Sequence, residues 1–426
     1  MTRSLGRIGL ADMNEHLRVD GARLWQSIMQ MADIGATANG GSHRLTLSDE
    51  DKAARDLFAG WCSEAGLTMQ VDELGDIFAR REGSDAKQAP VAIGSHLDTQ
   101  PFGGRFDGVF GVLAGLEVIR SLNDHGIATV KPLEVVNWTN EEGARFAPSM
   151  LASGVYGGVF ALDWALARRA VDTDATLLDE LRRIGYHGAL PAREREFAAF
   201  IECHIEQGPI LDSAGIPVGV VDAAQGFRWY DITLEGFASH TGSTPMVGRR
   251  NALLGMAKVA LAVEEIAAAH APLARGTVGS QVAVGPGSRN VIPGRVDFTV
   301  DLRHPSAATL EKMDAALRRA CEAAAAEYGL ELSLAQISDT QPVAFDTNCV
   351  AALERACARL GIENQRITSG AGHDACYVAR RAPTAMLFAP CKDGISHHES
   401  ESAEAADLEA VCNVLLHAAL ELAGVA

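Results

Sequence analysis

The stretch "PVAIGSHLDTQPFGGRFDGVFGVLAGLEVIRSL", residues 90–122, decides the fold. Its first residues predict a short buried strand, because they form a brief apolar run that ends in polar residues. Residues 106–122 predict a buried helix, and "LEVVNWTNEEG", residues 133–143, begins with another apolar strand. Continuously apolar strands separated by a helix favour a mostly parallel sheet that is covered on both faces.

Length and composition set the class of protein. A chain of 426 residues exceeds the size of a single growing core, so one large domain and a smaller one are expected. No run approaches the roughly 18 uncharged apolar residues of a membrane span. The formal net charge of −18 opposes nonspecific binding to nucleic acid or to an anionic membrane. An anionic substrate must therefore meet a local positive site.

Cysteine usage and the N-terminal segment indicate the compartment. The eight cysteines are scattered, without a C-x-x-C pair, in a chain too long to need disulfides. The opening "MTRSLGRIGLADMNEHLRVDG", residues 1–21, has no continuous apolar region of the secretory type. Both observations favour a cytoplasmic protein with reduced thiols.

The sequence changes character after residue 222. Segments of period-two alternation then follow, interleaved with two long helical patterns, which predicts an α+β unit. Buried strands and covering helices return towards the C-terminus. We therefore predict an α/β domain formed by residues 1–222 and 339–426, interrupted by an inserted α+β domain of residues 223–338.

Polar residues follow the predicted buried strands where each strand ends. In an open α/β sheet, ligands bind outside the carboxyl ends of the strands. Residues from four strand ends, together with one from the loop before the buried helix, can converge there. They are His96, Asp107, Glu142, His204 and one of His397 or His398.

This set of side chains predicts a metal site. Imidazole and carboxylate ligands suit Zn²⁺, Mn²⁺ or Co²⁺, whereas Ca²⁺ would require only oxygen ligands. One catalytic tetrahedral ion cannot take so many ligands and keep an open position, so two ions about 3.5–4 Å apart with a bridging carboxylate fit better. Asp98, which follows His96 closely, is placed to hydrogen-bond that imidazole and fix its tautomer.

The alternative is that these residues are structural. A single histidine or glutamate at a strand end is more often solvated or ion-paired than functional. Several buried strands that each end in histidine or an acid would be costly if left unpaired, because unneutralised buried charge strongly destabilises a fold. The joint placement favours the metal site.

Eight motifs resemble, in this order, those of the hydantoinase/carbamoylase family of amidases, which belongs to the aminoacylase-like clan of di-metal peptidases. The resemblance runs from about residue 20 to the C-terminus. The motifs are "GSHLDTQPFGGRFDG" (94–108), "NEEGARF" (140–146), "HIEQGPILD" (204–212), "SHTGSTPMVGRRNA" (239–252), "NVIPG" (290–294), "DLRHP" (301–305), "SGAGHDA" (369–375) and "GISHHESE" (394–401).

The resemblance implies a di-zinc peptidase-like catalytic domain with a mixed, mostly parallel sheet, and an inserted lid that also forms a homodimer. Zn²⁺ is the expected metal, and Mn²⁺, Co²⁺ or Ni²⁺ are also compatible with the ligands. By motif, His96 and His204 bind separate metals and Asp107 bridges them. Glu142 is the second metal's carboxylate, and His397 is the last ligand.

The resemblance also gives roles to residues beside the ligands. Glu141 takes the position of the general base, because a carboxylate beside the metals can move a proton from water to the leaving nitrogen. His398 is the variable neighbour of the ligand histidine. Glu401 fits the closing acid of the last motif. A solvated turn is the alternative interpretation of the Glu141–Glu142 pair.

Other matching positions concern the substrate. Arg303 and Asn290 lie in the inserted domain, where an arginine fork can bind a carboxylate bidentately, although a salt bridge within the domain would also explain Arg303. His240 matches the residue that polarises the scissile carbonyl in a neighbouring subunit. Three further positions resemble substrate contacts, namely Gln207, Gly370 and Gly372. His373 fits either a substrate contact or a structural hydrogen bond.

The reaction implied is hydrolysis of a ureido group, in which an N-carbamoyl amino acid gives an amino acid, ammonia and carbon dioxide. Allantoate and ureidoglycolate are alternative substrates with the same mechanism. A cysteine amidohydrolase is a rival, because Cys203 lies beside Glu202 and His204. A thiol at the end of a buried strand is more often an apolar filler. A serine hydrolase is disfavoured by the lack of a G-x-S-x-G elbow.

Overall fold

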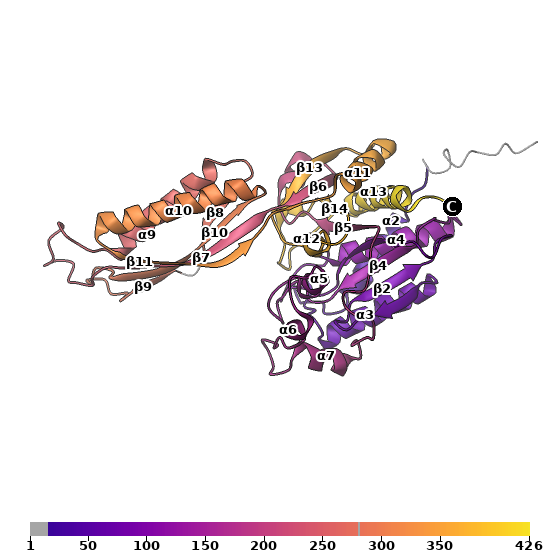
Figure 1. Cartoon of the computed structure of the whole chain (residues 1–426), viewed down its shortest axis with the longest axis horizontal. Helices are drawn as coiled ribbons and strands as arrows, with labels where there is room; N and C mark the ends of the chain where they lie inside the picture. The colour runs from indigo at the N-terminus through magenta and orange to yellow at the C-terminus, as the bar shows by residue number, and fades with distance from the viewer. Residues whose placement is uncertain (1–15, 280–281) are drawn as a thin grey trace, which may run out of the picture. The chain divides into compact units, whose positions relative to one another are not determined.

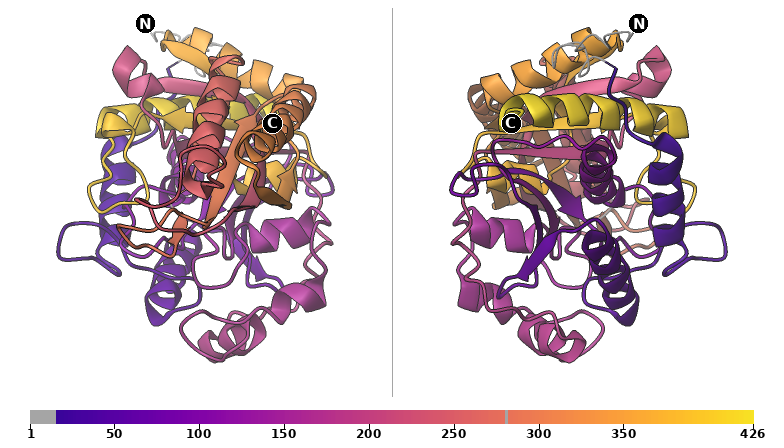
Figure 2. Two further views of the ribbon diagram at one scale, coloured as in Figure 1. Left: turned by 90° about the vertical axis from the view of Figure 1, so that its left-hand side faces the viewer. Right: turned by 90° about the vertical axis from the view of Figure 1, so that its right-hand side faces the viewer.

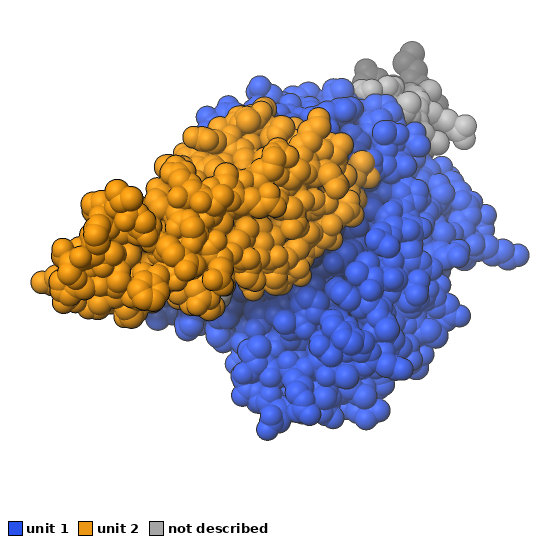
Figure 3. All heavy atoms as spheres, turned by 60° about the vertical axis from the view of Figure 1, so that its left-hand side comes forward, with its two compact units in different colours: residues 1–222, 345–426 blue, residues 223–344 orange. Residues whose placement is uncertain are grey.

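The chain folds into two compact units in a computed structural model that describes residues 16–279 and 282–426. Most of the segment considered above for a secretory signal lies outside the described residues. Unit 1 contains the described residues up to Asp222 together with Phe345–Ala426, and unit 2 is Ala223–Ala344 (Figure 3). The predicted return to the first domain at residue 339 precedes the observed boundary, because the last long strand of unit 2 continues to Thr340.

A mixed, mostly parallel sheet forms the centre of unit 1 (Figure 1). Four neighbouring strands, in the order β4-β3-β5-β14, run parallel, and antiparallel strands flank them on both sides. In sheet order the strands are β1 (Thr68–Val71), β2 (Ile77–Arg81), β4 (Leu133–Trp138), β3 (Val91–His96), β5 (Ala199–Ile205), β14 (Thr384–Ala389), β6 (Val218–Ala224) and β12 (Val343–Ala344), and β13 (Asn364–Ser369) pairs with β6.

Helices cover this sheet, and the four parallel strands are buried along their whole length. One group packs against the parallel strands and against itself: α2 (Gly21–Ala32), α4 (Val109–Asp124), α11 (Thr347–Leu360) and α13 (Ala405–Ala423). A second pair packs together near β5: α5 (Leu151–Tyr156) and α12 (Asp374–Val378). The other helical segments of unit 1 are α3 (Asp49–Glu64), α6 (Leu162–Leu166), α7 (Leu177–Ile184), α8 (Ile210–Ala214) and the 3₁₀ turn η1 (Lys392–Gly394).

The two ends of the described chain lie together in unit 1. Figure 2 shows the yellow α13 beside the indigo α2, although most of the sequence separates them. The main-chain N–H of Val19 donates to the side-chain oxygen of Asn413 at 2.9 Å. The first and last parts of the sequence thus complete one helical layer.

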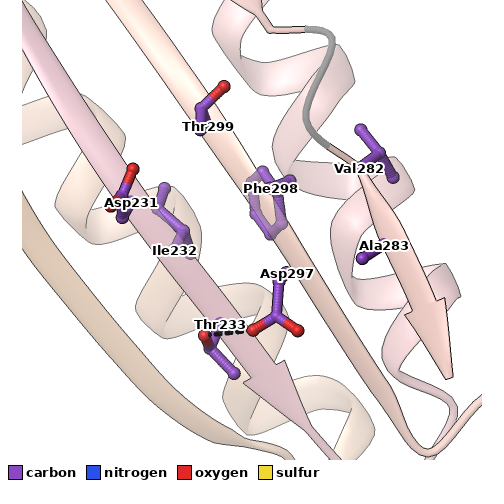
Figure 4. A pocket seen from close by; sticks show the side chains of 8 residues that line it. All are labelled: Asp231, Ile232, Thr233, Val282, Ala283, Asp297, Phe298 and Thr299. Atoms are coloured by element: carbon purple, nitrogen blue, oxygen red, sulfur yellow. Dashed lines mark hydrogen bonds between the residues drawn. The ribbon is translucent and has the colours of Figure 1, made fainter. Parts of the chain in front are cut away.

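Unit 2 has the α+β composition that the sequence predicts. Its sheet has the order β11-β7-β10-β8, with β9 also paired to β10, and two helices pack on one face. The other face of β7 and β10 carries Asp231, Thr233, Asp297 and Thr299, which line an open hollow (Figure 4). The elements are β7 (Gly226–Glu235), α9 (Ala252–Ala268), β8 (Arg275–Val278), β9 (Ala283–Gly285), β10 (Arg295–His304), α10 (Ala307–Tyr328) and β11 (Glu331–Thr340).

Burial in unit 2 follows the period of each strand. Alternate residues of β7 and β10, such as Ile232 and Val300, are buried beneath α9 and α10. The residues between them are exposed or half-buried. This alternation is typical of an antiparallel sheet with one covered face.

Close packing of α4 on the sheet gives the first testable prediction. A Cβ atom on Gly111 of α4 would lie 2.2 Å from the main-chain oxygen of Cys203, whereas a Cβ on Gly60 of α3 would meet nothing within 4 Å. Gly111→Ala should therefore lower the free energy of unfolding by about 1–3 kcal/mol through overpacking. Gly60→Ala, the matched control, should raise it by about 0.5–1 kcal/mol.

Thermal unfolding of the two variants, recorded under identical conditions, measures both effects. The expected result is a lower midpoint for Gly111→Ala and a slightly higher one for Gly60→Ala. Equal midpoints would show that α4 can move away from β5 without cost.

Candidate metal centre

The predicted ligands lie at the carboxyl ends of the parallel strands. His96 is the last residue of β3, and in parallel register it lies opposite Trp138, the last residue of β4. His204 is near the end of β5, Asp107 immediately precedes the N-cap of α4, and His397 follows β14 after the η1 turn. These segments meet at one edge of the sheet, as the strand-end argument predicts.

The donor atoms form two groups that share Asp107, and within each group they lie within 4.8 Å of one another. Oδ1 of Asp107 is 3.4 Å from Nε2 of His96 and 3.2 Å from Nε2 of His204. Oδ2 of Asp107 is 3.5 Å from Nε2 of His397, which is 3.6 Å from Oε2 of Glu142. Asp107 thus has the position of a bridging ligand.

One expectation from the resemblance is wrong. His96 and His204 do not belong to separate groups, because both imidazoles face the same oxygen of Asp107. They come from neighbouring strands, β3 and β5, which places them side by side. The other group takes His397, while His398 is hydrogen-bonded instead to Oγ of Ser400 at 2.7 Å.

The tautomers of two histidines are fixed by main-chain carbonyl groups. Nδ1 of His96 donates to the oxygen of Asp98 and Nδ1 of His204 to that of Ile205, each at 2.9 Å. Each ring therefore turns the lone pair of Nε2 towards Asp107. Nε2 of His96 is buried and has no hydrogen-bond partner in the described part of the chain. An orphaned imidazole nitrogen facing a carboxylate is what a metal ion would satisfy.

The centre concentrates buried charge. Burial alone would raise the pKa of Asp107, but the imidazoles of His204 and His96 outweigh it and lower that pKa well below its ordinary value. Burial, with the nearby Asp107, raises the pKa of Glu142 to about 8. Buried carboxylates this close together require a cation, and the nitrogen and oxygen donors fit Zn²⁺, Mn²⁺ or Co²⁺.

Asp98 contributes by a different contact from the one predicted. Its carboxylate is 3.8 Å from Nδ1 of His96, so its main-chain oxygen makes the closer contact with that ring. The carboxylate accepts hydrogen bonds from the main-chain N–H groups of Glu141 at 3.4 Å and Glu142 at 3.3 Å, and from Oγ1 of Thr46 at 2.6 Å. Asp98 therefore also holds the turn that carries the two glutamates.

Glu141 lies beside the two groups without belonging to either. Its Oε2 is 3.5 Å from Nε2 of His96. Its main-chain oxygen accepts a hydrogen bond from Met150 at 2.6 Å, and Asn140 before it adopts a positive φ of 62°. Burial raises the pKa of its carboxyl group well above the ordinary value; His96 opposes this, and Asp374 and Glu142 add to it. A carboxyl group of this kind can hold and release a proton.

The predicted substrate residues of unit 1 lie near the centre. Nε2 of Gln207 donates to Oδ2 of Asp107 at 2.8 Å and is 3.2 Å from Nε2 of His397. Gly370 and Gly372 belong to the loop between β13 and α12, and a Cβ on Gly372 would lie 2.8 Å from the methyl carbon of Met150.

His373 of the same loop is buried beside His204, with ring centroids 4.6 Å apart. Its Nε2 is 2.9 Å from Oγ of Ser369, so a structural hydrogen bond is present.

The remaining predicted residues, His240, Asn290 and Arg303, belong to unit 2. His240 forms a bridge with Val291, and N–H of Thr241 donates to the oxygen of Asn290 at 3.0 Å, so the two loops run together. Arg303 on β10 is paired with Asp301 at 2.8 Å.

Sequence reasoning missed some contacts around the ligands. Oγ of Ser396 is 2.9 Å from Oδ2 of Asp107 and 3.0 Å from Oε2 of Glu401, and its single proton can be donated to either of them. Glu401 accepts from the main-chain N–H groups of Phe106 and Asp107, and burial raises its pKa to about 7. Gln100 contacts Glu142. Each lies within a quoted motif, but spacing alone could not assign the contacts.

A third group of possible donors is Glu202, His204 and His373. Both oxygens of Glu202 already accept hydrogen bonds, from Oγ of Ser95 at 2.7 Å and from N–H of Ala375 at 2.8 Å. Cys203, the rival nucleophile, is fully buried, and burial raises the pKa of its thiol well above the ordinary value. A reactive thiolate requires the opposite conditions.

Comparison with known proteins agrees with this geometry. Residues 92–421 match the model of peptidase family M20/M25/M40. An N-carbamoyl-L-amino-acid amidohydrolase of Rhizobium meliloti is 47% identical over 414 residues, covering 97% of this chain and 99% of that protein. An allantoate amidohydrolase of Bacillus subtilis is 32% identical over 384 residues, covering 89% of this chain and 92% of that protein.

A solved structure gives the same result. The crystal structure of an amidase of the hydantoinase/carbamoylase family from Burkholderia multivorans has a TM-score of 0.93 and 57% sequence identity, covering 96% of this chain and 98% of that one. The M20 peptidases are metal-dependent, as the two ligand groups require. The chain therefore belongs to the hydantoinase/carbamoylase amidases within peptidase family M20/M25/M40, and it is a hydrolase of amide bonds.

Proposed function

We propose that this protein hydrolyses the ureido C–N bond of N-carbamoyl amino acids, either N-carbamoyl-L-amino acids or N-carbamoyl-β-alanine. The products are the amino acid, ammonia and carbon dioxide. The observation that carries the proposal is the pair of donor groups sharing Asp107 with the Glu141 carboxyl group beside them. The Rhizobium relative named for this activity supports the choice of substrate.

Allantoate or ureidoglycolate is the alternative substrate, and the mechanism would be the same. The relative from Bacillus subtilis named allantoate amidohydrolase supports it, at lower identity. Both substrate classes combine a ureido group with a carboxylate, so the ligand groups alone do not discriminate them.

The proposed cofactor is a pair of divalent ions, in the first instance Zn²⁺, held by the residues that the two groups contain: His96, Asp107, His204, Glu142 and His397. When bound, the ions supply Lewis-acid polarisation and lower the pKa of water. Asp107 would contact both ions. The carbonyl contacts at Nδ1 keep His96 and His204 in the tautomer that ligation requires.

Glu141 is the proposed general base. Its carboxylate takes a proton from the attacking water, and the same group returns the proton to the leaving nitrogen, which breaks the C–N bond. Its raised pKa favours the first step, because a more basic carboxylate takes a proton from water more readily.

Residues of both units are proposed as substrate contacts. In unit 2, the Arg303 guanidinium and Asn290 are proposed to bind a carboxylate of the substrate. In unit 1, Gln207, Gly370 and Gly372 are proposed as further substrate contacts. Nδ1 of His240 accepts hydrogen bonds from Gly242 at 3.0 Å and Ser243 at 3.1 Å, which leaves Nε2 to donate to the scissile carbonyl.

A homodimer through unit 2 is part of the proposal. Unit 2 exposes several large apolar side chains that a second copy of the chain would cover. They include Trp229, Leu253, Leu254, Leu261, Val284 and Ile337.

A cytoplasmic location is also proposed, supported by eight free cysteines, all buried. No helix in the described part of the chain is long and apolar enough to span a membrane.

A substrate panel tests the proposed activity, with ammonia release as the readout. Purified protein loaded with Zn²⁺ should release ammonia from N-carbamoyl-L-amino acids or N-carbamoyl-β-alanine faster than from allantoate or ureidoglycolate. Complete chelation should abolish the reaction and added metal should restore it, because the ions would supply the polarisation of the carbonyl and the lowered pKa of water. Faster release from allantoate would select the alternative.

Cys203→Ser is the control for the rival thiol mechanism. The variant should retain near-normal turnover, since the thiol is buried and protonated. Activity that survives chelation and disappears in Cys203→Ser would contradict the metal mechanism.

Substitutions of the two adjacent glutamates should have different effects on metal content and kcat. Glu141→Gln should keep both metals and lower kcat by about 10²–10⁴-fold, because it removes only proton transfer. Glu142→Gln, the matched variant one residue away, should lose one metal. Metal content per chain and kcat, measured on the same samples, check both outcomes. Near-normal turnover of Glu141→Gln would show that another group is the base.

Mixed dimers should reveal whether His240 acts on the neighbouring subunit. His240→Ala and Glu141→Gln are each expected to be inactive. If His240 acts across the dimer, an equal statistical mixture should regain about a quarter of wild-type activity, because half of the dimers contain one complete site. Co-expression with two affinity tags isolates the mixed dimer, and no recovered activity there would show action within one chain.

A further inference from the structure

Gln100 makes an unusual set of contacts with one of the two adjacent glutamates. Its side-chain Nε2 donates to Oε2 of Glu142 at 2.8 Å, and its main-chain N–H donates to Oε1 at 3.1 Å. Nε2 is also 3.4 Å from the main-chain oxygen of Glu142. Among the described residues, Gln100 alone therefore donates hydrogen bonds to both carboxylate oxygens of Glu142.

The segment that contains Gln100 also holds the main chain of Glu142. Asp98, two residues earlier, accepts a hydrogen bond from N–H of Glu142 at 3.3 Å. The segment after β3 thus holds the backbone and the carboxylate of a residue after β4. Since β3 and β4 are neighbouring parallel strands, their ends lie side by side.

Glu141 has no comparable restraint. Asp98 accepts from its N–H group at 3.4 Å, but no hydrogen bond reaches its carboxylate from the described residues. The pair is therefore asymmetric: the Glu142 carboxylate accepts hydrogen bonds from two donors, and the Glu141 carboxylate accepts none from the described residues. The asymmetry originates in Gln100, which donates hydrogen bonds to Glu142 and none to Glu141.

We propose that Gln100 is a positioning residue that aligns the Glu142 carboxylate with Asp107 and His397 and so sets the affinity of that one metal site. The inference rests on the proposed two-metal function. It concerns how the chain prepares one ligand, and it gives Gln100 no contact with substrate.

Two physical effects explain why the hydrogen bonds from Gln100 to Glu142 should strengthen metal binding. A glutamate side chain loses considerable rotamer freedom when it binds a metal, and a ligand that is already fixed loses less. The two donors also keep both oxygens in one orientation, in which Oε2 lies 3.6 Å from Nε2 of His397. Loss of an outer hydrogen-bond partner of a ligand typically weakens metal binding by about 10–100-fold.

Gln100→Met tests the proposal, because methionine has a similar length and keeps the main-chain N–H but removes the side-chain donor. Both the variant and the wild type are dialysed against a series of chelator-buffered Zn²⁺ solutions, and zinc per chain is measured by atomic emission. The expected result is one ion retained as in the wild type and the other bound at least tenfold more weakly, with excess Zn²⁺ restoring both.

Three further variants make the test specific. Gln88→Met, in a surface loop, is the matched control and should bind zinc as the wild type does. In the Glu142→Gln background, which should already lack this ion, Gln100→Met should leave the remaining ion at wild-type affinity, because Gln100 acts through Glu142. Gln100→Asn, whose amide is one methylene shorter, should weaken the same site and serves if the methionine variant does not fold.

Two results would overturn the proposal. One is Gln100→Met and Gln100→Asn binding both ions with wild-type affinity. The other is weaker binding of the remaining ion when Gln100→Met is added to Glu142→Gln. Metal content is independent of the substrate chosen. A wild type that binds two ions but hydrolyses no ureido compound would therefore contradict only the proposed function.

Discussion

The Asp107 carboxylate is the constraint on which the rest of the site depends. Its two oxygens face different partners, with His96 and His204 on one side and His397 on the other. A single side chain can serve both groups only if its loop is fixed within a few tenths of an ångström. Glu401 provides part of that restraint by accepting hydrogen bonds from Asp107 N–H and from the residue before it.

The arrangement also explains how neighbouring residues of one chemical type acquire different properties. Glu141 and Glu142 are consecutive, equally buried and attached to the same turn by Asp98. They differ in their side-chain neighbours: the Glu142 carboxylate accepts hydrogen bonds from Gln100, whereas the Glu141 carboxylate faces His96. Environment, and not residue type, therefore gives the two carboxyl groups different contacts, and the different roles proposed for them rest on that difference.

Much of the architecture was predictable from the sequence. Four apolar strands with polar residues at their ends require a covered parallel sheet, and that sheet brings His96, Glu142 and His204 to one edge. The pairing of His96 with His204 was not predictable from the motifs, because it depends on how the loop turns Asp107. The hydrogen bond between Asp98 and the His96 ring was predicted, but not that the carbonyl oxygen of Asp98 makes it while the carboxylate accepts from the main chain of the two glutamates.

The position of β14 in the sheet has a consequence for synthesis. β14 is paired in parallel with β5, yet the whole of unit 2 is translated between them. At roughly 5–20 residues per second, the about 190 residues from His204 to His397 take about 10–40 s to emerge. During that time the nascent chain already carries Asp107 and Glu142 but lacks His397 and Glu401. The group of donors that includes His397 can therefore be complete only on a nearly finished chain.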